Sequence, residues 1–340
     1  MGAPKGYTAP MREFQRAAAR QSWVAALFGA VLLSFPLSSL AAPFQVKNHS
    51  PVFFGLLYPS ASIPRALTEG DISARADFSY SSIFFQDVNP GWSYIFDMEL
   101  AQLTFGFRRG FGSFEGGVEL PLFYAGGGFL DQAILDNHRM FGFVDYNGQR
   151  EAPRNRYLYS LVHNGKEWSP ALPYAVALGD VTVWLKRELL ADGERGGLAA
   201  ELLLQAPSAI TGAGLGNGAW EYGFMLIAQR RFGETELTFN GGAVNPGFID
   251  RGEKIALNPM YVCDGAVEQF LTDRLSAVAQ LSYVTSPYGE GAPALFRRAW
   301  MGITFGARYV TPGGQPIDIS FTEDLTQTAP DFTIGFGFQF

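Results

Sequence analysis

Hydrophobic and polar residues alternate with a period of two over most of the chain. The clearest example is the last stretch, DFTIGFGFQF at residues 331–340, in which every second residue is large and apolar and the others are small or polar. A strand with this pattern needs an apolar medium on one face and tolerates water on the other. The same division predicts further strands at residues 72–81, 94–107, 114–122, 181–188, 200–205, 220–229, 237–240, 261–268, 275–283, 301–309 and 317–321.

These segments amount to roughly 12 strands, an even number, as in single-chain outer-membrane barrels. Short turns, such as residues 109–112 and 231–234, alternate with longer loops, such as residues 206–219 and 286–297. This asymmetry is typical of a transmembrane antiparallel β-barrel. We therefore predict an all-β barrel over residues 71–340. A secreted β-propeller is the main soluble alternative, but the chain has no internal repeat of blade length.

The order of the last residues also carries information. Phe336, Phe338 and the terminal Phe340 resemble the recognition signal of Gram-negative outer-membrane barrels, which end on an aromatic residue after alternating apolar ones. From this we predict insertion into the outer membrane of a Gram-negative bacterium. The expected partners are the barrel-assembly machinery, outer-membrane lipid and lipopolysaccharide.

The N-terminal region has a different character. Four basic residues precede an apolar run from Trp23 to Phe35, and small residues follow at 38–42, so residues 1–41 are predicted to be a secretory signal peptide. An uncleaved anchor is disfavoured because the run is short and broken by Pro36. Residues 42–70 hold no alternation and are rich in proline. We expect them to form a lead-in that is either periplasmic or tucked into the barrel mouth.

Composition narrows the class further. The chain has 340 residues, 15% aromatic, with 40 glycines, which favours strands and tight turns over helices. Its formal net charge is -7, which gives no support to nucleic-acid binding. The single cysteine, Cys263, excludes an internal disulfide, and three scattered histidines do not form a metal site. We expect no cofactor.

One strand breaks the simple pattern. From Trp92 onward, Tyr94, Phe96 and Met98 are predicted to face lipid, whereas further along the apolar positions shift by one residue to Leu103, Phe105 and Phe107. A β-bulge near Ala101 is the simplest way to keep all of them on one face.

The opposite face of the predicted strands carries many charged residues, which we expect to line the lumen. They could line a wet, cation-favouring pore, or they could pair and fill a closed one. The predicted lumen-lining residues are Arg75, Asp77, Asp97, Glu99, Arg108, Glu115, Glu119, Asp180, Lys186, Glu188, Glu201, Glu221, Glu268, Arg308 and Asp318.

The long loop at residues 125–173 interrupts the strands and contains a segment with helical spacing. Such a helix could fold into the lumen as a constriction, cover the mouth as a lid, or be an ordinary loop helix. His138 in this segment suggests a general base for a lipid-active hydrolase, but no nucleophile can be placed beside it, so no catalytic residue is predicted. The predicted constriction residues are Phe129, Leu130, Ile134, His138 and Phe141.

Three stretches together resemble a known family. They are ELPLFYAGGGFLDQAILDNHRMFGF, GDVTVWLKREL and LLLQAPSAITGAG, with Asn48 and Pro51 in the lead-in. They are similar to uncharacterised proteobacterial outer-membrane proteins known only as a domain of unknown function. The resemblance implies a barrel and no catalytic residues. We therefore expect a narrow passive channel for small polar solutes restricted by the 125–173 loop. A hydrolase using His138 and a non-conducting structural barrel remain as alternatives.

Overall fold

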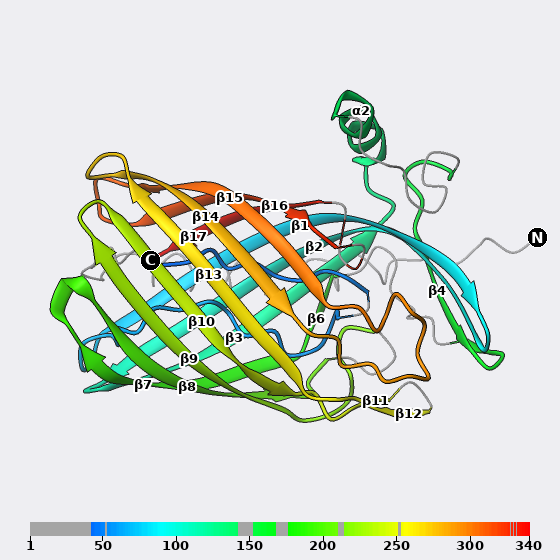
Figure 1. Cartoon of the computed structure of the whole chain (residues 1–340), viewed down its shortest axis with the longest axis horizontal. Helices are drawn as coiled ribbons and strands as arrows, with labels where there is room; N and C mark the ends of the chain where they lie inside the picture. The colour runs from blue at the N-terminus through cyan, green and yellow to red at the C-terminus, as the bar shows by residue number, and fades with distance from the viewer. Residues whose placement is uncertain are drawn as a thin grey trace, which may run out of the picture.

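Twelve antiparallel strands close into a barrel (Figure 1). The computed structural model describes residues 42–51, 53–141, 152–167, 176–209, 214–250, 253–326, 328, 330 and 332–340. The predicted signal peptide, residues 1–41, therefore lies outside the described residues. The barrel strands are β1 (Ile72–Asn89), β2 (Trp92–Phe111), β3 (Phe114–Gly126), β7 (Val181–Ala191), β8 (Gly196–Ala206), β9 (Glu221–Phe232), β10 (Thr235–Asn245), β13 (Met260–Phe270), β14 (Leu275–Val284), β15 (Trp300–Val310), β16 (Pro316–Asp324) and β17 (Phe332–Gln339).

The C-terminal strand closes the barrel against the first one. β17 pairs with β1 in an unbroken antiparallel register from Arg75 opposite Gln339 to Ser82 opposite Phe332. Phe78 and Phe336 lie directly opposite each other, and their ring centroids are 6.5 Å apart. Because closure pairs the backbone groups of both edges, no strand edge is left open along this seam.

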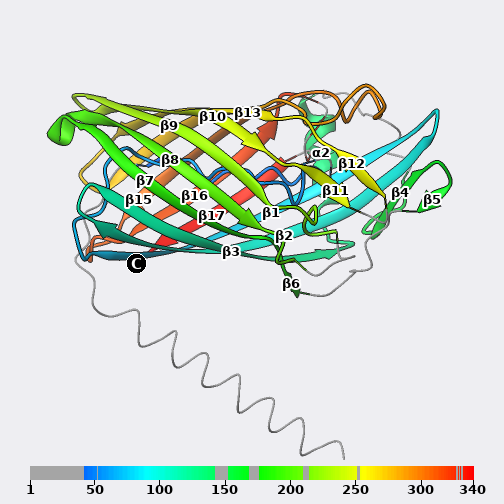
Figure 2. The same ribbon diagram turned by 90° about the horizontal axis from the view of Figure 1, so that it is seen from below.

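The connections differ in length at the two ends of the barrel, as Figure 2 shows. We call the end with the short connections the turn end; one of these carries the 3-10 helix η2 (Gly193–Arg195). The opposite, loop end carries the remaining elements: α2 (Asp131–Phe141), β4 (Leu158–His163), β5 (Lys166–Glu167), β6 (Val176–Leu178), β11 (Phe248–Asp250) and β12 (Lys254–Ala256). Among the described residues, no helix is long and apolar enough to cross a membrane.

The predicted bulge near Ala101 is wrong. β2 pairs with β1 without a register shift from Arg109 to Trp92, so side chains alternate strictly along its 20 residues. Tyr94, Phe96 and Met98 consequently face the barrel interior, where each is less than 5% exposed. The hairpin of β1 and β2 extends past its neighbours at the loop end (Figure 1), and its inner face packs on apolar groups there. The apolar side of the sequence pattern changes because the surroundings change along the strand.

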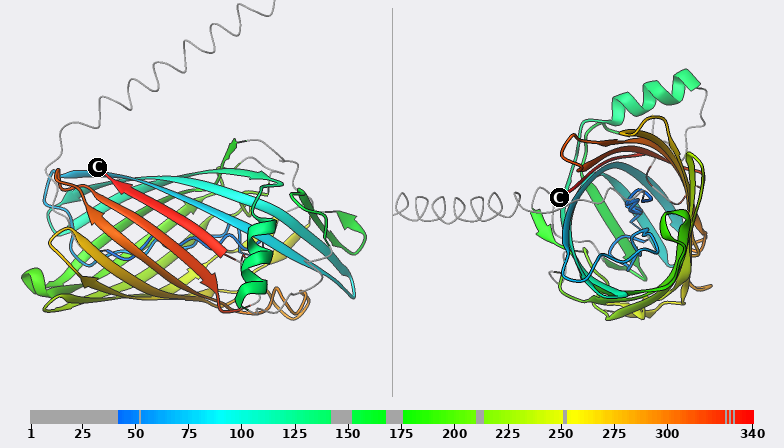
Figure 3. Two further views of the ribbon diagram at one scale, coloured as in Figure 1. Left: turned by 90° about the horizontal axis from the view of Figure 1, so that it is seen from above. Right: turned by 90° about the vertical axis from the view of Figure 1, so that its left-hand side faces the viewer.

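Residues 42–70, here called the inner segment, run through the barrel interior (Figure 3). Phe44 and Leu57 of this segment are each 1% exposed, and Phe53 is 4% exposed. The segment turns back on itself near Phe53 and Gly55, and it returns to the turn end, where Glu69 bridges to Gly110 of β2. The lead-in thus fills the barrel rather than lying beside it.

The inward residues divide along the barrel axis. Near the turn end they are mostly charged, whereas near the loop end many are apolar and form one buried cluster with the tip of the inner segment. Apolar packing excludes water from the interior at that level. The cluster at the loop end includes Phe53, Leu56, Leu57, Phe96, Leu100, Val244, Met260, Val262, Val284, Phe296 and Trp300.

Candidate functional site

Most of the residues predicted to line the lumen do turn into the barrel, and they surround the inner segment. They lie on the same face of their strands as the residues that contact this segment. The inward members of the predicted set are Arg75, Asp77, Arg108, Glu115, Glu119, Asp180, Lys186, Glu188, Glu201, Glu221, Glu268, Arg308 and Asp318.

Asp97 and Glu99 are the exceptions, and their predicted place in the lumen is wrong. Since β2 has no bulge, both carboxylates point to the outer side of the barrel, where the loop after β3 covers them. Asp97 accepts a hydrogen bond from Arg156 at 3.0 Å. Glu99 accepts one from the amide of Phe129 at 2.8 Å and others from Leu130 and from the hydroxyl of Tyr80.

The helix of the long loop lies outside the barrel wall, so the predicted constriction is also wrong. Figures 1 and 3 show α2 beside the loop end and not across the lumen. Phe129 is 70% exposed, and its ring stacks on Tyr80 with centroids 5.7 Å apart. The amide of Leu130 donates a hydrogen bond to the outward Glu99, and the side chain of Ile134 on the helix is 2% exposed.

The side chains of His138 and Phe141 lie outside the described residues, as does the loop at 142–151. The structure therefore does not test the hypothesis that His138 acts as the general base of a hydrolase. Among the described residues, no group of three or more histidine, cysteine or carboxylate side chains is placed to hold a metal ion.

Inward carboxylates accept hydrogen bonds from backbone amides of the inner segment. The amide of Leu57 donates to Glu221 at 2.9 Å, that of Ala66 to Glu188 at 3.0 Å, and that of Leu67 to Glu115 at 2.8 Å. A buried segment that pairs with no strand must find side-chain partners for its amides, since leaving them unpaired costs about 1–3 kcal/mol each. The acidic inner face thus supports the segment as well as charging the lumen.

Lys186 donates hydrogen bonds to backbone carbonyl groups of the same segment. Its ammonium group is fully buried, donates to the carbonyl of Ile63 at 2.9 Å, and forms an ion pair with Glu115 at 3.1 Å. Asn240 contributes both a donor and an acceptor: it accepts from the amide of Ser62 at 2.9 Å and donates to the carbonyl of Ser62 at 3.1 Å. The returning half of the segment is therefore bound along its length by β3, β7 and β10.

A charge network links four strands near the turn end. Arg75 binds Asp77 at 2.7 Å and Asp318 at 2.8 Å, and Arg308 binds Asp318 at 2.8 Å and Glu268 at 2.9 Å. Both arginines have carboxylates on two sides, which compensates the cost of burying the charges. This part of the interior matches the predicted alternative in which inward charges pair with each other.

His49 occupies a polar cage in the outgoing half of the inner segment. Its Nε2 lies 2.8 Å from Oε1 of Gln102, which can only accept, so Nε2 donates and Nδ1 accepts from the hydroxyl of Ser81 at 2.7 Å. Burial, reinforced by the charge of Lys47, lowers the pKa of His49 from 6.5 to about 4, although the bond to Gln102 opposes this. The imidazole is therefore neutral at pH 7 and serves to anchor the segment.

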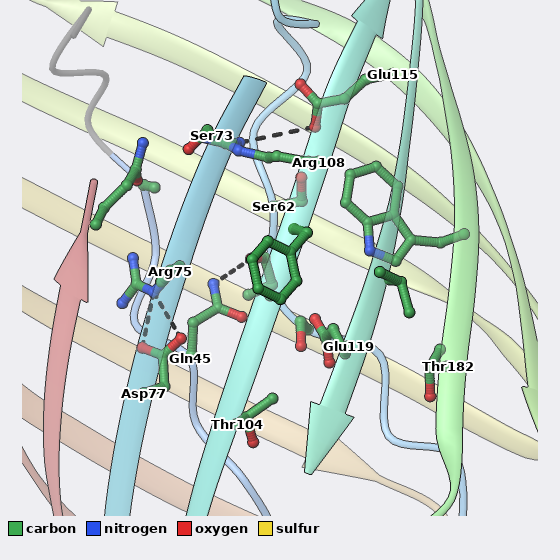
Figure 4. Close-up of a pocket in the computed structure, with 18 of the residues that line it drawn as sticks. Gln45, Ser62, Ser73, Arg75, Asp77, Thr104, Arg108, Glu115, Glu119 and Thr182 are labelled. Atoms are coloured by element: carbon green, nitrogen blue, oxygen red, sulfur yellow. Dashed lines mark hydrogen bonds and ion pairs between the residues drawn. The ribbon is translucent and has the colours of Figure 1, made fainter. Parts of the chain in front are cut away.

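Two adjoining cavities lie between the inner segment and one side of the wall. Figure 4 shows residues that line the first of them. The first, about 100 Å³, opens toward the turn end, and the second, about 60 Å³, reaches the segment tip at Phe53 and Leu215. Such volumes hold several water molecules each. Both are lined by Lys47, Tyr58, Thr104, Glu119 and Thr182. At this junction the ammonium of Lys47 lies 3.3 Å from the carboxylate of Glu119.

Several interior residues were missed in the sequence. Lys47, His49 and Tyr58 belong to a segment without alternation, so no periodicity could assign them a side. Glu236 was missed although it alternates with apolar neighbours in β10, whereas the alternation in β13 does place Asp264 on the inward face. Tyr58 donates a hydrogen bond to Asp264 at 3.4 Å, and Gln229 donates to Glu236.

The closed barrel, its outward apolar face and its filled polar interior define an outer-membrane β-barrel. The chain belongs to the family described as "Protein of unknown function (DUF3187)", whose model matches residues 30–340. No curated protein matches the sequence.

Solved structures with a similar fold are outer-membrane barrels. An outer-membrane channel from Pseudomonas putida F1 has a TM-score of 0.53 and 12% identity, covering 81% of this chain and 96% of that one. The NanC porin has a TM-score of 0.43 and 8% identity, covering 79% and 97%. The β domain of the Bordetella autotransporter BrkA has a TM-score of 0.42 and 11% identity, covering 79% and 99%. At these identities the likeness concerns the fold.

Proposed function

We propose that the protein is a passive channel for small polar solutes in the outer membrane of a Gram-negative bacterium, held closed by its own inner segment. The observation that carries this proposal is the pair of cavities that meet at Lys47 and Glu119. They form a discontinuous path along one wall, running from the turn end to the tip of the segment. The wall is formed by β1, β2, β3, β7 and β8, and the path is interrupted by side chains of the inner segment.

The charge of the interior favours cations. Inward carboxylates outnumber the inward cations of the barrel strands, so displacement of the inner segment would leave a negatively charged lumen. The inward carboxylates are Asp77, Glu115, Glu119, Asp180, Glu188, Glu201, Glu221, Glu236, Asp264, Glu268 and Asp318. The inward cations are Arg75, Arg108, Lys186, Arg308 and, at the turn end, Arg231.

The restriction belongs to the inner segment rather than to the 125–173 loop. Phe53, Leu56 and Leu57 pack against apolar groups near the loop end, and a polar solute cannot cross such a layer without desolvation. Opening therefore requires the tip of the segment to withdraw toward the turn end. The segment is joined to β1 at that end, so withdrawal does not require any barrel strand to separate.

A reversible crosslink tests this mechanism. The side chain of Asn240 on β10 forms two hydrogen bonds with the backbone of Ser62 on the segment, so Ser62→Cys with Asn240→Cys, in a Cys263→Ser background, places one thiol on each of two adjacent elements. A short bifunctional thiol reagent that forms disulfides with both cysteines then links the segment to the wall. We expect single-channel currents in planar bilayers that disappear on crosslinking and return on reduction. The Cys263→Ser protein, treated identically, is the control and should conduct under both conditions.

A non-conducting structural barrel is the second candidate. The observation that favours it is the set of backbone bonds to Glu115, Glu188 and Glu221, which anchor the segment firmly. Under this alternative neither the reduced crosslink variant nor the control conducts. A separate variant that lacks the inner segment and still forms a barrel does not conduct either. That result would exclude the channel.

A further inference from the structure

Glu201 on β8 differs from the other inward carboxylates. Its residue is only 4% exposed, yet its carboxylate has no hydrogen bond or ion pair with any of the residues that the structure describes. Lys186 lies directly opposite on β7, but its ammonium turns to Glu115 and to the carbonyls of the inner segment. A buried carboxylate without a partner is costly, which makes its place beside a cavity informative.

The same cavity already holds a primary ammonium group. Lys47 reaches into it from the inner segment and donates to the hydroxyl of Ser60 at 2.6 Å and to Glu119 at 3.3 Å. Four carboxylates line this cavity, and three of them have cationic partners: Asp77 pairs with Arg75, Glu115 with Lys186 and Arg108, and Glu119 with Lys47. Glu201 is the fourth. Thr182 adds a hydroxyl, and Tyr58 and Trp184 add aromatic surface suited to a cation.

We propose that this cavity binds the primary ammonium group of a small organic amine, with Glu201 as its carboxylate partner. The proposal rests on the proposed channel function and specifies its solute as a protonated amine. The ammonium is the chemistry that the cavity already accommodates in Lys47. A cavity of about 100 Å³ suits a solute of a few heavy atoms. Multivalent metal ions are a poorer match, since no metal-binding group of three donors exists among the described side chains.

The test measures binding without current. The purified full chain in detergent is melted at pH 8 with increasing methylammonium chloride, and separately with potassium chloride at the same ionic strength. We expect methylammonium, and not potassium, to raise the melting temperature in a saturable manner. Glu201→Gln should weaken the apparent affinity at least about tenfold, because it removes the charged acceptor of the ammonium. Glu236→Gln, which changes an inward carboxylate that lines neither of the two cavities, should leave the affinity unchanged.

The outcomes separate the inference from the channel. Equal stabilisation by both salts would assign the site to inorganic monovalent cations and overturn the amine. A wild-type protein that conducts but does not respond to methylammonium would overturn the inference and leave the channel standing. Saturable, Glu201-dependent binding in a protein that passes no current would support the site and exclude the channel. If Glu201→Gln fails to fold, the comparison of methylammonium with potassium in the wild-type protein still tests the proposal. Glu201→Asp, which keeps the negative charge, then replaces Glu201→Gln and should retain binding.

Discussion

The ammonium of Lys47 lies 3.3 Å from the carboxylate of Glu119, and this ion pair joins the inner segment to the barrel wall where the two cavities meet. Its side chains are 12% and 20% exposed, so the pair is partly shielded from water. The contact lies on the proposed path and on the element that the proposed opening displaces. Under this proposal it couples the charge of the lumen to the position of the segment.

Removing this link should favour the open state. Lys47→Met keeps most of the side-chain volume and loses about 1 kcal/mol of charged interaction, which corresponds to about a fivefold increase in the open-to-closed ratio. Open probability in planar bilayers is the measurement. Lys254→Met is the matched control, since Lys254 is 66% exposed at the loop end and its nitrogen lies 3.8 Å from Asp250. Equal open probability in wild type and Lys47→Met would contradict the gating role of the pair.

Acid should loosen the inner segment through His49. The pKa of His49 is about 4 in the closed barrel against 6.5 for an exposed imidazole, because burial disfavours the charged form. Above pH 6.5 both states are neutral and nothing changes. As the pH falls from 6.5 toward 4, the released segment binds a proton that the buried one does not, so closure weakens. The full effect, reached below about pH 4, is about 3 kcal/mol.

Hydrogen exchange of the inner segment, corrected for the intrinsic pH dependence of exchange, measures this effect between pH 7 and pH 4.5. Protection of its amides should fall in wild type and stay nearly constant in His49→Gln, which can still bond to Ser81 and cannot titrate. Peptides of the wall strands serve as internal controls. Loss of protection to the same extent in both proteins would assign the acid effect to other groups.

The architecture was readable from the sequence because it rests on a period of two. Strands such as β9 and β13 expose large apolar groups to lipid and turn carboxylates inward, and both faces are visible in the alternation. The same rule failed for Asp97 and Glu99, because the apolar residues of β2 face a packed interior near the loop end and the acids face a covering loop. Alternation shows which residues share a face of a strand, but it does not show whether that face contacts lipid, water or other protein groups.

The inner segment was harder to place. It carries no regular hydrogen-bond pattern, and its partners are side chains from many strands, such as Glu221 on β9 and Asn240 on β10. Those contacts join residues more than 160 positions apart along the chain, a separation that local sequence patterns do not encode. The sequence allowed two places for this segment, outside the barrel or in its mouth, and only the closed barrel distinguishes them.

A close approach of two glycines fixes the tip of the inner segment. A Cβ on Gly55, whose φ is +81°, would come within 3.0 Å of the backbone of Gly216 in the loop between β8 and β9. A Cβ on Gly216 would overlap the carboxylate of Asp180, which accepts a hydrogen bond from the amide of Ala209 at 2.7 Å. Gly216→Ala should therefore displace Asp180 and loosen both the loop and the tip.

We expect Gly216→Ala to lower the free energy of unfolding by about 1–3 kcal/mol, the usual cost of an extra methyl group in a packed site. Urea titration in detergent measures the change, with the folded fraction read from the difference in gel mobility between unheated and heated samples. Gly265→Ala is the control, because a Cβ there meets nothing within 4 Å. A Gly216→Ala protein as stable as the control would show that the tip adapts and is not held by this contact.

Glu99 should control the order of α2 without affecting conduction. Its carboxylate accepts the amides of Phe129 and Leu130 just before the helix begins at Asp131, where negative charge also favours the helix dipole. Glu99→Ala leaves these donors unpaired, at about 1–3 kcal/mol for each one that stays buried, so amide protection over residues 129–141 should fall about tenfold or more. Glu99→Gln keeps an acceptor oxygen and should preserve most of the protection. Because the helix lies outside the wall, the single-channel currents of both variants should equal those of wild type. Altered currents with unchanged amide protection of the helix would instead indicate that the loop restricts the lumen.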